Sequence, residues 1–122
     1  MLIQLPVLIA VCIFLYCIDF LTAIDFSEKN YQAFRKHEGN KSLVWYVEQA
    51  RLTKSNKPLI ESHIYNLITF IVSTLAMGVV GYYIFDLQFS TGVGMFLIVQ
   101  MIAHIIGIIT NTIAIRKFKE GK

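Results

Sequence analysis

Three long apolar runs dominate the chain, and charged residues mark their limits. The first run ends at Asp19, and the second begins after Glu61. Asp86 separates the second run from the third, which ends at Arg116. A helix that crosses a bilayer needs about 20 predominantly apolar residues. The pattern therefore predicts an all-α integral membrane protein with three transmembrane helices, at about residues 3–24, 63–85 and 90–115.

The segment 25–62, between the first two spans, is too long for a simple turn and predicts two short helices. Ser27 is expected to cap the first of them, which ends near His37 at a Gly-Asn pair. Ser42 is expected to cap the second, at about residues 43–52. A proline shortly before the second span suits the start of the next helix, because its fixed φ is already helical.

The predicted helix at about 43–52 is amphipathic. Its apolar positions recur at helical spacing and are Leu43, Val44, Val47 and Ala50. Trp45 and Tyr46 are aromatic residues of the kind that gather at membrane–water interfaces. We therefore expect this helix to lie on the inner membrane surface, with Trp45 and Tyr46 as its anchors.

Each predicted span carries its polar or small residues on one helix face. In the third span these residues are Gln100, His104, Gly107 and Asn111. In the second span they are Asn66, Thr69, Ser73 and Met77, and in the first Cys12, Tyr16, Asp19 and Ala23. Polar groups in a span usually face other helices or water. We expect the three faces to pack against one another.

The depth of each polar residue can be compared at about 1.5 Å per residue. On this measure Asp19 shares the inner half of the membrane with Thr69, Asn66 and Asn111, and a direct contact with His104 needs helix tilt or a bridging water. The alternative is that Asp19 reaches the headgroups. The predicted intramembrane polar cluster consists of Asp19, Asn66, Thr69, Gln100, His104 and Asn111.

The distribution of charge predicts an orientation. Only 16% of residues are charged, and seven of the eleven Lys and Arg residues lie in 25–62 while the other four follow the third span. The positive-inside rule then puts the N-terminus outside and the loop and C-terminus in the cytoplasm, in a multi-pass protein of the cell membrane. The first run has no preceding Lys or Arg, so we expect a retained helix rather than a signal peptide. The net charge of +3 reflects this rule rather than nucleic-acid binding.

The motifs of common enzyme classes are absent from the sequence. It has no glycine loop for phosphate, no HExxH and no nucleophile elbow, and we expect no enzyme activity, catalytic residue, metal site or cofactor. Cys12 and Cys17 are five residues apart and would point away from each other on a helix, so no disulfide is expected.

We expect one membrane unit, 1–122, that consists of the first span, the cytoplasmic-side loop 25–62, the hairpin 63–115 and the basic tail 116–122. The favoured function is an accessory or interaction subunit whose loop and tail bind a protein partner or lipid. The alternative is a self-associating channel or transporter component with Asp19 and His104 in its polar path. The plan of three spans and a basic tail resembles that of phage holins, with a longer loop here. That resemblance implies a pore former and assigns no role to any residue.

Overall fold

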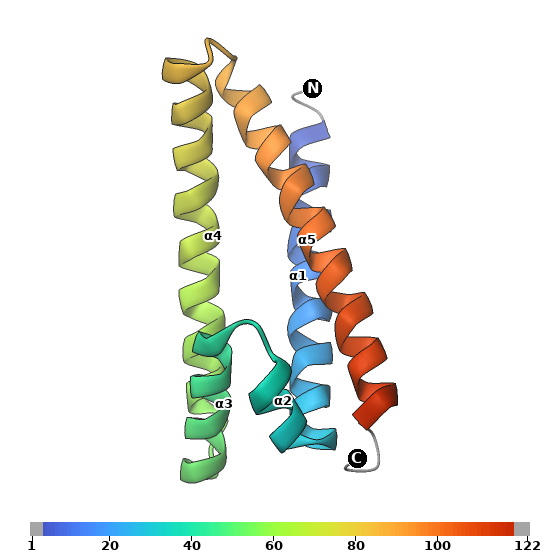
Figure 1. Cartoon of the computed structure of the whole chain (residues 1–122). Helices are drawn as coiled ribbons and strands as arrows, with labels where there is room; N and C mark the ends of the chain where they lie inside the picture. The colour runs from blue at the N-terminus through green and yellow to red at the C-terminus, as the bar shows by residue number, and fades with distance from the viewer. Residues whose placement is uncertain (1–3, 119–122) are drawn as a thin grey trace.

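The computed structural model describes residues 4–118, and it contains helices and no strand within that range. The helices are α1 (Gln4–Lys29), α2 (Tyr31–His37), α3 (Lys41–Thr53), α4 (Lys57–Ile84) and α5 (Phe89–Phe118) (Figure 1). Helices α1, α4 and α5 are long and apolar enough to cross a membrane. The predicted all-helical class and the three candidate spans are therefore confirmed.

The two short helices begin at other caps than the sequence pattern predicted. Ser27 lies inside α1, where its hydroxyl donates to the carbonyl of Ile24 at 2.6 Å. Asn30 caps α2 instead, because its side-chain oxygen accepts from the backbone N–H of Ala33 at 3.1 Å. The sequence has no Gly or Pro between residues 19 and 29, so nothing ends α1 where it leaves the apolar run.

Helix α3 is also capped at another residue than expected, in this case an earlier one. Asn40 adopts an extended backbone, and its side chain accepts from Leu43 N at 3.2 Å, which leaves Ser42 within the helix. Asn and Ser are about equally good caps, so the sequence alone did not show which of the two residues begins the helix. The helix ends at Lys54, which has a left-handed backbone with φ of 52°.

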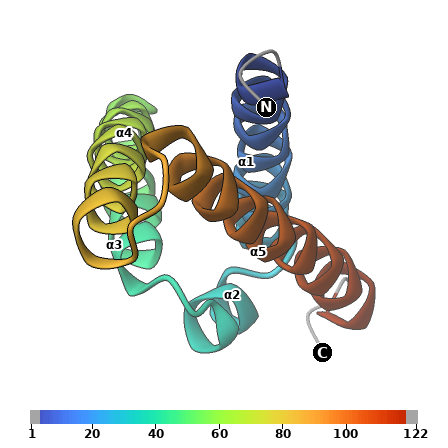
Figure 2. The ribbon, with the colours of Figure 1, turned by 90° about the horizontal axis from the view of Figure 1, so that it is seen from above.

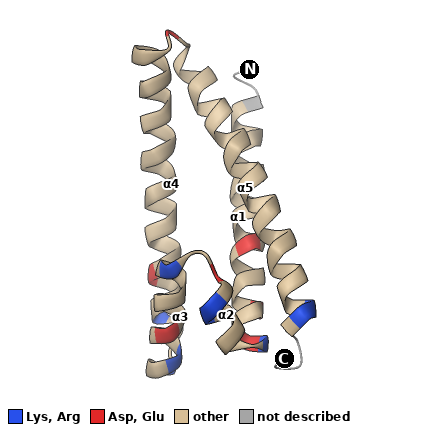
Figure 3. Ribbon diagram, in the orientation of Figure 1, with Lys and Arg blue, Asp and Glu red and all other residues tan. Residues whose placement is uncertain are grey.

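The helices α2 and α3 occupy one end of the molecule, which we call the loop end. The turn between α4 and α5 occupies the opposite end, which we call the hairpin end (Figure 1). Helix α5 crosses α1 obliquely and diverges from α4 toward the loop end, as the view along the bundle also shows (Figure 2). The described Lys and Arg residues all lie at the loop end (Figure 3). Asp19 is the first charged residue of α1, and Asp25 is the next.

Two apolar clusters hold the bundle. At the loop end, α1, α2 and α3 share a core of Phe20, Ala23, Phe26, Ala33, Phe34, Leu43, Val44 and Val47. The apolar face of α3 that the pattern assigned to the membrane surface is thus buried in protein, because it closes over the end of α1 and α2. Toward the hairpin end, α1 and α5 pack through Cys12, Val93 and Leu97.

Helices α4 and α5 approach most closely at three glycines near the hairpin end. A Cβ atom built on Gly92 would lie 2.9 Å from the carbonyl oxygen of Met77 and 3.4 Å from the Cα of Gly78. Gly81 lies on the same side, and a Cβ atom added to it would lie 3.3 Å from the Cα of Gly92. Small residues that let two backbones meet are a usual basis of helix pairing in membranes.

The close contact predicts that Gly92→Ala destabilises the protein. The added methyl meets backbone atoms that cannot move aside, so the free energy of unfolding should fall by about 1–3 kcal/mol despite the higher helix propensity of Ala. Circular dichroism of the purified protein during unfolding in detergent measures it. Gly39→Ala is the control, since nothing lies within 4 Å of its added Cβ. Equal stability of the two variants would contradict the proposed role of the glycine contact.

Candidate functional site

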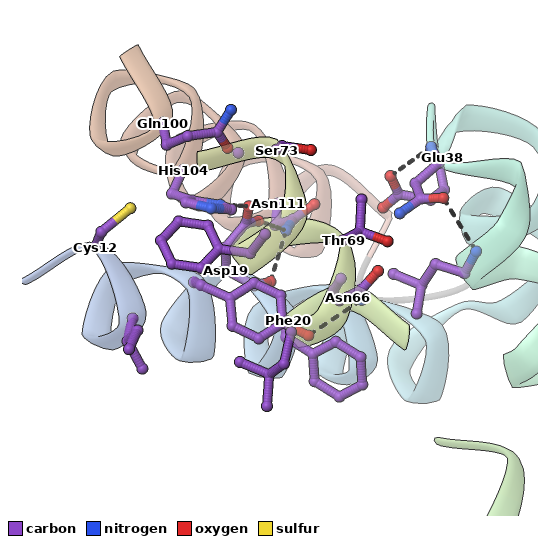
Figure 4. A pocket seen from close by; sticks show the side chains of 18 of the residues that line it. Cys12, Asp19, Phe20, Glu38, Asn66, Thr69, Ser73, Gln100, His104 and Asn111 are labelled. Carbon is purple, nitrogen blue, oxygen red and sulfur yellow. Dashed lines mark hydrogen bonds and ion pairs between the residues drawn. The ribbon is translucent and has the colours of Figure 1, made fainter. Parts of the chain in front are cut away.

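The carboxylate of Asp19 is held by three residues of α5. His104 donates from Nδ1 to Oδ2 at 3.0 Å, and Asn111 donates from Nδ2 to Oδ1 at 3.2 Å. Between them, a Cβ on Gly107 would lie 2.6 Å from each carboxylate oxygen. The three residues stand at i, i+3 and i+7, so one face of a single helix supplies a donor on either side of the carboxylate and a space for it (Figure 4).

Asn111 also ties the backbone of α1 to α5. Its Nδ2 lies 3.3 Å from the carbonyl oxygen of Asp19 and 3.1 Å from the hydroxyl of Thr22, which itself donates to that carbonyl at 2.9 Å. Asn111 is only 8% exposed. Its amide thus meets three acceptors of α1, which is the interhelical use of Asn that membrane proteins favour.

The direct contact between Asp19 and His104 follows from helix tilt. From their depths alone, Asp19 and His104 could meet only if the helices tilt or a water bridges them. Helix α5 is indeed inclined across α1 (Figure 1). Of the three partners predicted for Asp19 by depth, only Asn111 contacts it. Asn66 bonds to Tyr16 instead, and no hydrogen bond of Thr69 with Asp19 is present among the described residues, so Asn111 is the one of those three candidates that Asp19 meets.

Tyr16 is the second centre of the site. The sequence predicted it on the polar face of the first span and indicated no partner for it. Its hydroxyl accepts from Asn66 Nδ2 at 3.1 Å and shares a hydrogen bond of 3.0 Å with His63 Nδ1. Phe20 lies against the ring of His63, with centroids 3.8 Å apart. The signal was present in the spacing, since His63 and Asn66 stand at i and i+3 and so share one face of α4.

The polar faces line a half-open cavity rather than closing on one another. Its volume is about 360 Å³, and α1, α4, α5 and the turn between α2 and α3 line it. Gln100, Ser73 and Thr69 all belong to the lining of this space (Figure 4). Within residues 4–118 these three side chains make no hydrogen bond to protein atoms, so the predicted packing of the three faces was wrong in this region.

The two ends of this cavity differ in chemistry. Toward the hairpin end, Val93 and Leu97 pack with Cys12 between α1 and α5, and Cys12 belongs to the lining. Toward the loop end, Glu38 and Asn40 belong to the lining. The cavity therefore reaches from the middle of the bundle to the end that carries the basic residues.

Of the remaining predicted positions, Trp45, Tyr46 and Cys17 lie outside the cavity. Trp45 is 55% exposed on α3 and its ring meets that of Tyr46 edge to face, 5.0 Å between centroids. Cys17 is a free thiol, as is Cys12 at the edge of the lining. In the part of the chain that the structure describes, no three His, Cys, Asp or Glu side chains are grouped to hold a metal ion.

Comparison with known proteins does not add an assignment: no family model matches the chain, and neither a curated protein nor a solved structure matches it. The geometry of the site is therefore the basis of every functional argument below.

The space over Gly107 predicts an energetic coupling with Asp19. Gly107→Ala should lower the free energy of unfolding by about 1–3 kcal/mol, because the new methyl displaces the carboxylate from its donors. In an Asp19→Ala background the same change should cost little, since the three nearest atoms to that Cβ all belong to Asp19. A double-mutant cycle of unfolding in detergent measures the coupling. The same loss of stability in both backgrounds would argue against the proposed fit of the Asp19 carboxylate over Gly107.

Proposed function

We propose that this protein is a membrane-embedded binding component that admits a small polar solute or cation from its loop end to Asp19. The observation that carries the proposal is the half-open polar cavity, which a single chain lines with Asp19 and other polar side chains. Cavities of about 300–1,000 Å³ with a few convergent polar groups are the usual form of small-molecule sites. We propose binding rather than catalysis at this site.

The proposed orientation places the loop end in the cytoplasm. Support comes from the charges, because all described Lys and Arg residues lie at the loop end and the α4–α5 turn carries only Asp86 (Figure 3). The N-terminus is then outside and the C-terminus inside, in the cell membrane. The cavity would open to the cytoplasm.

A channel or transporter component is one form of this function. The cavity lies within a single chain, which supports a role of Asp19 and His104 in handling protons or cations. A path across the whole membrane needs a further opening beyond Leu97, whose side chain is fully buried. Self-association or a rearrangement of the helices would have to supply that opening.

The proposal predicts sided access to the cavity. In a background with Cys12→Ala and Cys17→Ala, Ser73→Cys should react with a membrane-impermeant, water-soluble thiol reagent added from the loop side, because Ser73 lines the cavity. Reagent added from the other side should not reach it. Labelling of intact cells and of inverted vesicles, followed by a gel-shift assay, compares the two sides.

Two reference variants make the result decisive. Val72→Cys, on the adjacent lipid-facing side of α4, should stay unlabelled from both sides, since Val72 is 60% exposed on the outside of the bundle. Ser55→Cys, in the exposed turn before α4, reports which side of the membrane the loop end faces. Failure of Ser73→Cys to react from the side that labels Ser55→Cys would overturn the proposal.

The second candidate is an accessory subunit that binds a protein partner through α3. The observation that favours it is an apolar pair on the free face of α3, where Trp45 is 55% and Leu52 is 71% exposed. The two residues are seven apart and so lie on one side of the helix. The same surface, with Tyr46 and the basic tail, would also suit contact with the lipid headgroups.

This candidate predicts that Trp45→Ala with Leu52→Ala abolishes a stable complex. One partner should co-purify with the tagged wild-type protein from native membranes in a mild detergent and should be lost at least about tenfold in the double variant. Tyr83→Ala is the control, because Tyr83 is 78% exposed near the hairpin end. Equal recovery by both variants would remove α3 as the docking surface.

A further inference from the structure

The charges that line the cavity select for a cation. Asp19 and Glu38 belong to the lining, and no Lys or Arg is among the lining residues that the structure describes. This is the reverse of the chain as a whole, which has a net charge of +3 and gathers its basic residues at the same end. An anion would therefore meet two carboxylates and neither a Lys nor an Arg in the cavity.

Two groups of lining side chains add a second, independent indication. The first consists of hydrogen-bonding side chains without a protein partner among residues 4–118, namely Gln100, Thr69 and Ser73. Polar groups at membrane depth are costly unless water or a ligand satisfies them. These side chains supply amide and hydroxyl oxygens that can accept from a donor-rich ligand. A primary ammonium group carries three N–H donors and no acceptor, so it can donate to these oxygens and to the carboxylate of Asp19 together.

The second group consists of apolar and aromatic walls. Its members are Ile13, Phe20, Leu67, Phe70 and Phe96, and they belong to α1, α4 and α5. A hydrated inorganic ion gains little from such walls, whereas an alkyl chain buries its surface against them. The aromatic faces also attract an organic cation. The volume of about 360 Å³ suits a small molecule of this kind.

We infer that the cavity binds a primary alkylammonium cation, whose nitrogen contacts Asp19 and the free oxygens of the lining and whose alkyl part lies against the aromatic walls. Asp19 is 24% exposed toward this space although His104 and Asn111 hold it in place. Glu38 lines the cavity nearer the loop end, where its carboxylate attracts the cation as it enters. This inference rests on the proposed function and names the ligand class of the same site.

The ammonium group has two sources to distinguish, a free amine in solution and the headgroup of phosphatidylethanolamine. Both present the same primary ammonium to Asp19. A phosphatidylcholine headgroup carries a quaternary ammonium without N–H donors, and so it cannot satisfy the lining oxygens. Bilayers of these two lipids therefore distinguish the sources.

The test is calorimetric titration of the full-length protein in phosphatidylcholine nanodiscs with butylammonium. The neutral analogue butanol and the anionic analogue butyrate should each bind at least about tenfold more weakly, because they lack the charge that pairs with the carboxylates. Butylammonium binding that weakens at least about tenfold in discs containing phosphatidylethanolamine identifies the lipid headgroup as the natural occupant. Unchanged binding identifies a free amine.

Two substitutions locate the binding. Asp19→Asn should weaken the binding of butylammonium at least about tenfold, and Glu38→Gln should weaken it several-fold, each by removing one lining charge. Glu28→Gln is the matched control, because Glu28 is exposed on α1 and does not line the cavity. If Asp19→Asn does not fold, Glu38→Gln still tests the site. Butylammonium that binds no better than butanol, or binds Glu38→Gln and Asp19→Asn as tightly as wild type, overturns the inference.

The failure of this inference differs from a failure of the proposed function. If Ser73→Cys reacts from the loop side while butylammonium does not bind, the cavity is accessible and the ligand class is wrong. If Ser73→Cys is closed to reagent from that side, the proposed function itself fails.

Discussion

A carboxylate in the middle of a membrane-spanning helix must find hydrogen-bond donors within the protein, and the packing of α1 on α5 meets that need. His104 and Asn111 donate to Asp19 from one face of α5, and Gly107 leaves room for the carboxylate between them. These contacts set the register of the two helices. They also require α5 to incline across α1, since only then does His104 reach the level of Asp19 (Figure 1).

The inclination of α5 shapes the rest of the molecule. At the hairpin end α5 lies against α4 through glycines, and toward the loop end it leaves α4 and follows α1 (Figure 2). The polar face of α4 then stands opposite a space, which Tyr16 bridges only in part through its bonds to His63 and Asn66. The core shared by α1, α2 and α3 supports this half of the bundle. The cavity is thus a consequence of where the helices can and cannot meet.

The sequence predicted the features that repeat along one helix, but not the angles at which the helices cross. Apolar runs and helical spacing predicted three candidate spans and placed Asp19, His104 and Asn111 on polar faces, because both follow from the geometry of a single helix. The tilt that joins Asp19 to His104 depends on how two helices cross, which no single-helix pattern contains. The predicted N-caps, Ser27 and Ser42, were wrong because Asn30 and Asn40 lie close by and cap a helix about equally well. The cavity, being the space that three helices leave, could not be anticipated.

The glycine contact of α4 with α5 has a mechanical consequence. At Gly81 and Gly92 the two backbones touch directly, so one helix can turn slightly on the other there without side chains in the way, while the ring of Phe89 packs over Gly78. From Gly78 to the start of α4 at Lys57 the helix runs about 30 Å, at about 1.5 Å per residue. A rotation of about 5° at this fulcrum moves the far end of α4 by nearly 3 Å, roughly the diameter of a water molecule. The part of α4 that would move lines the polar cavity, so a small rotation at the glycine contact changes the width of the cavity at the other end of the bundle.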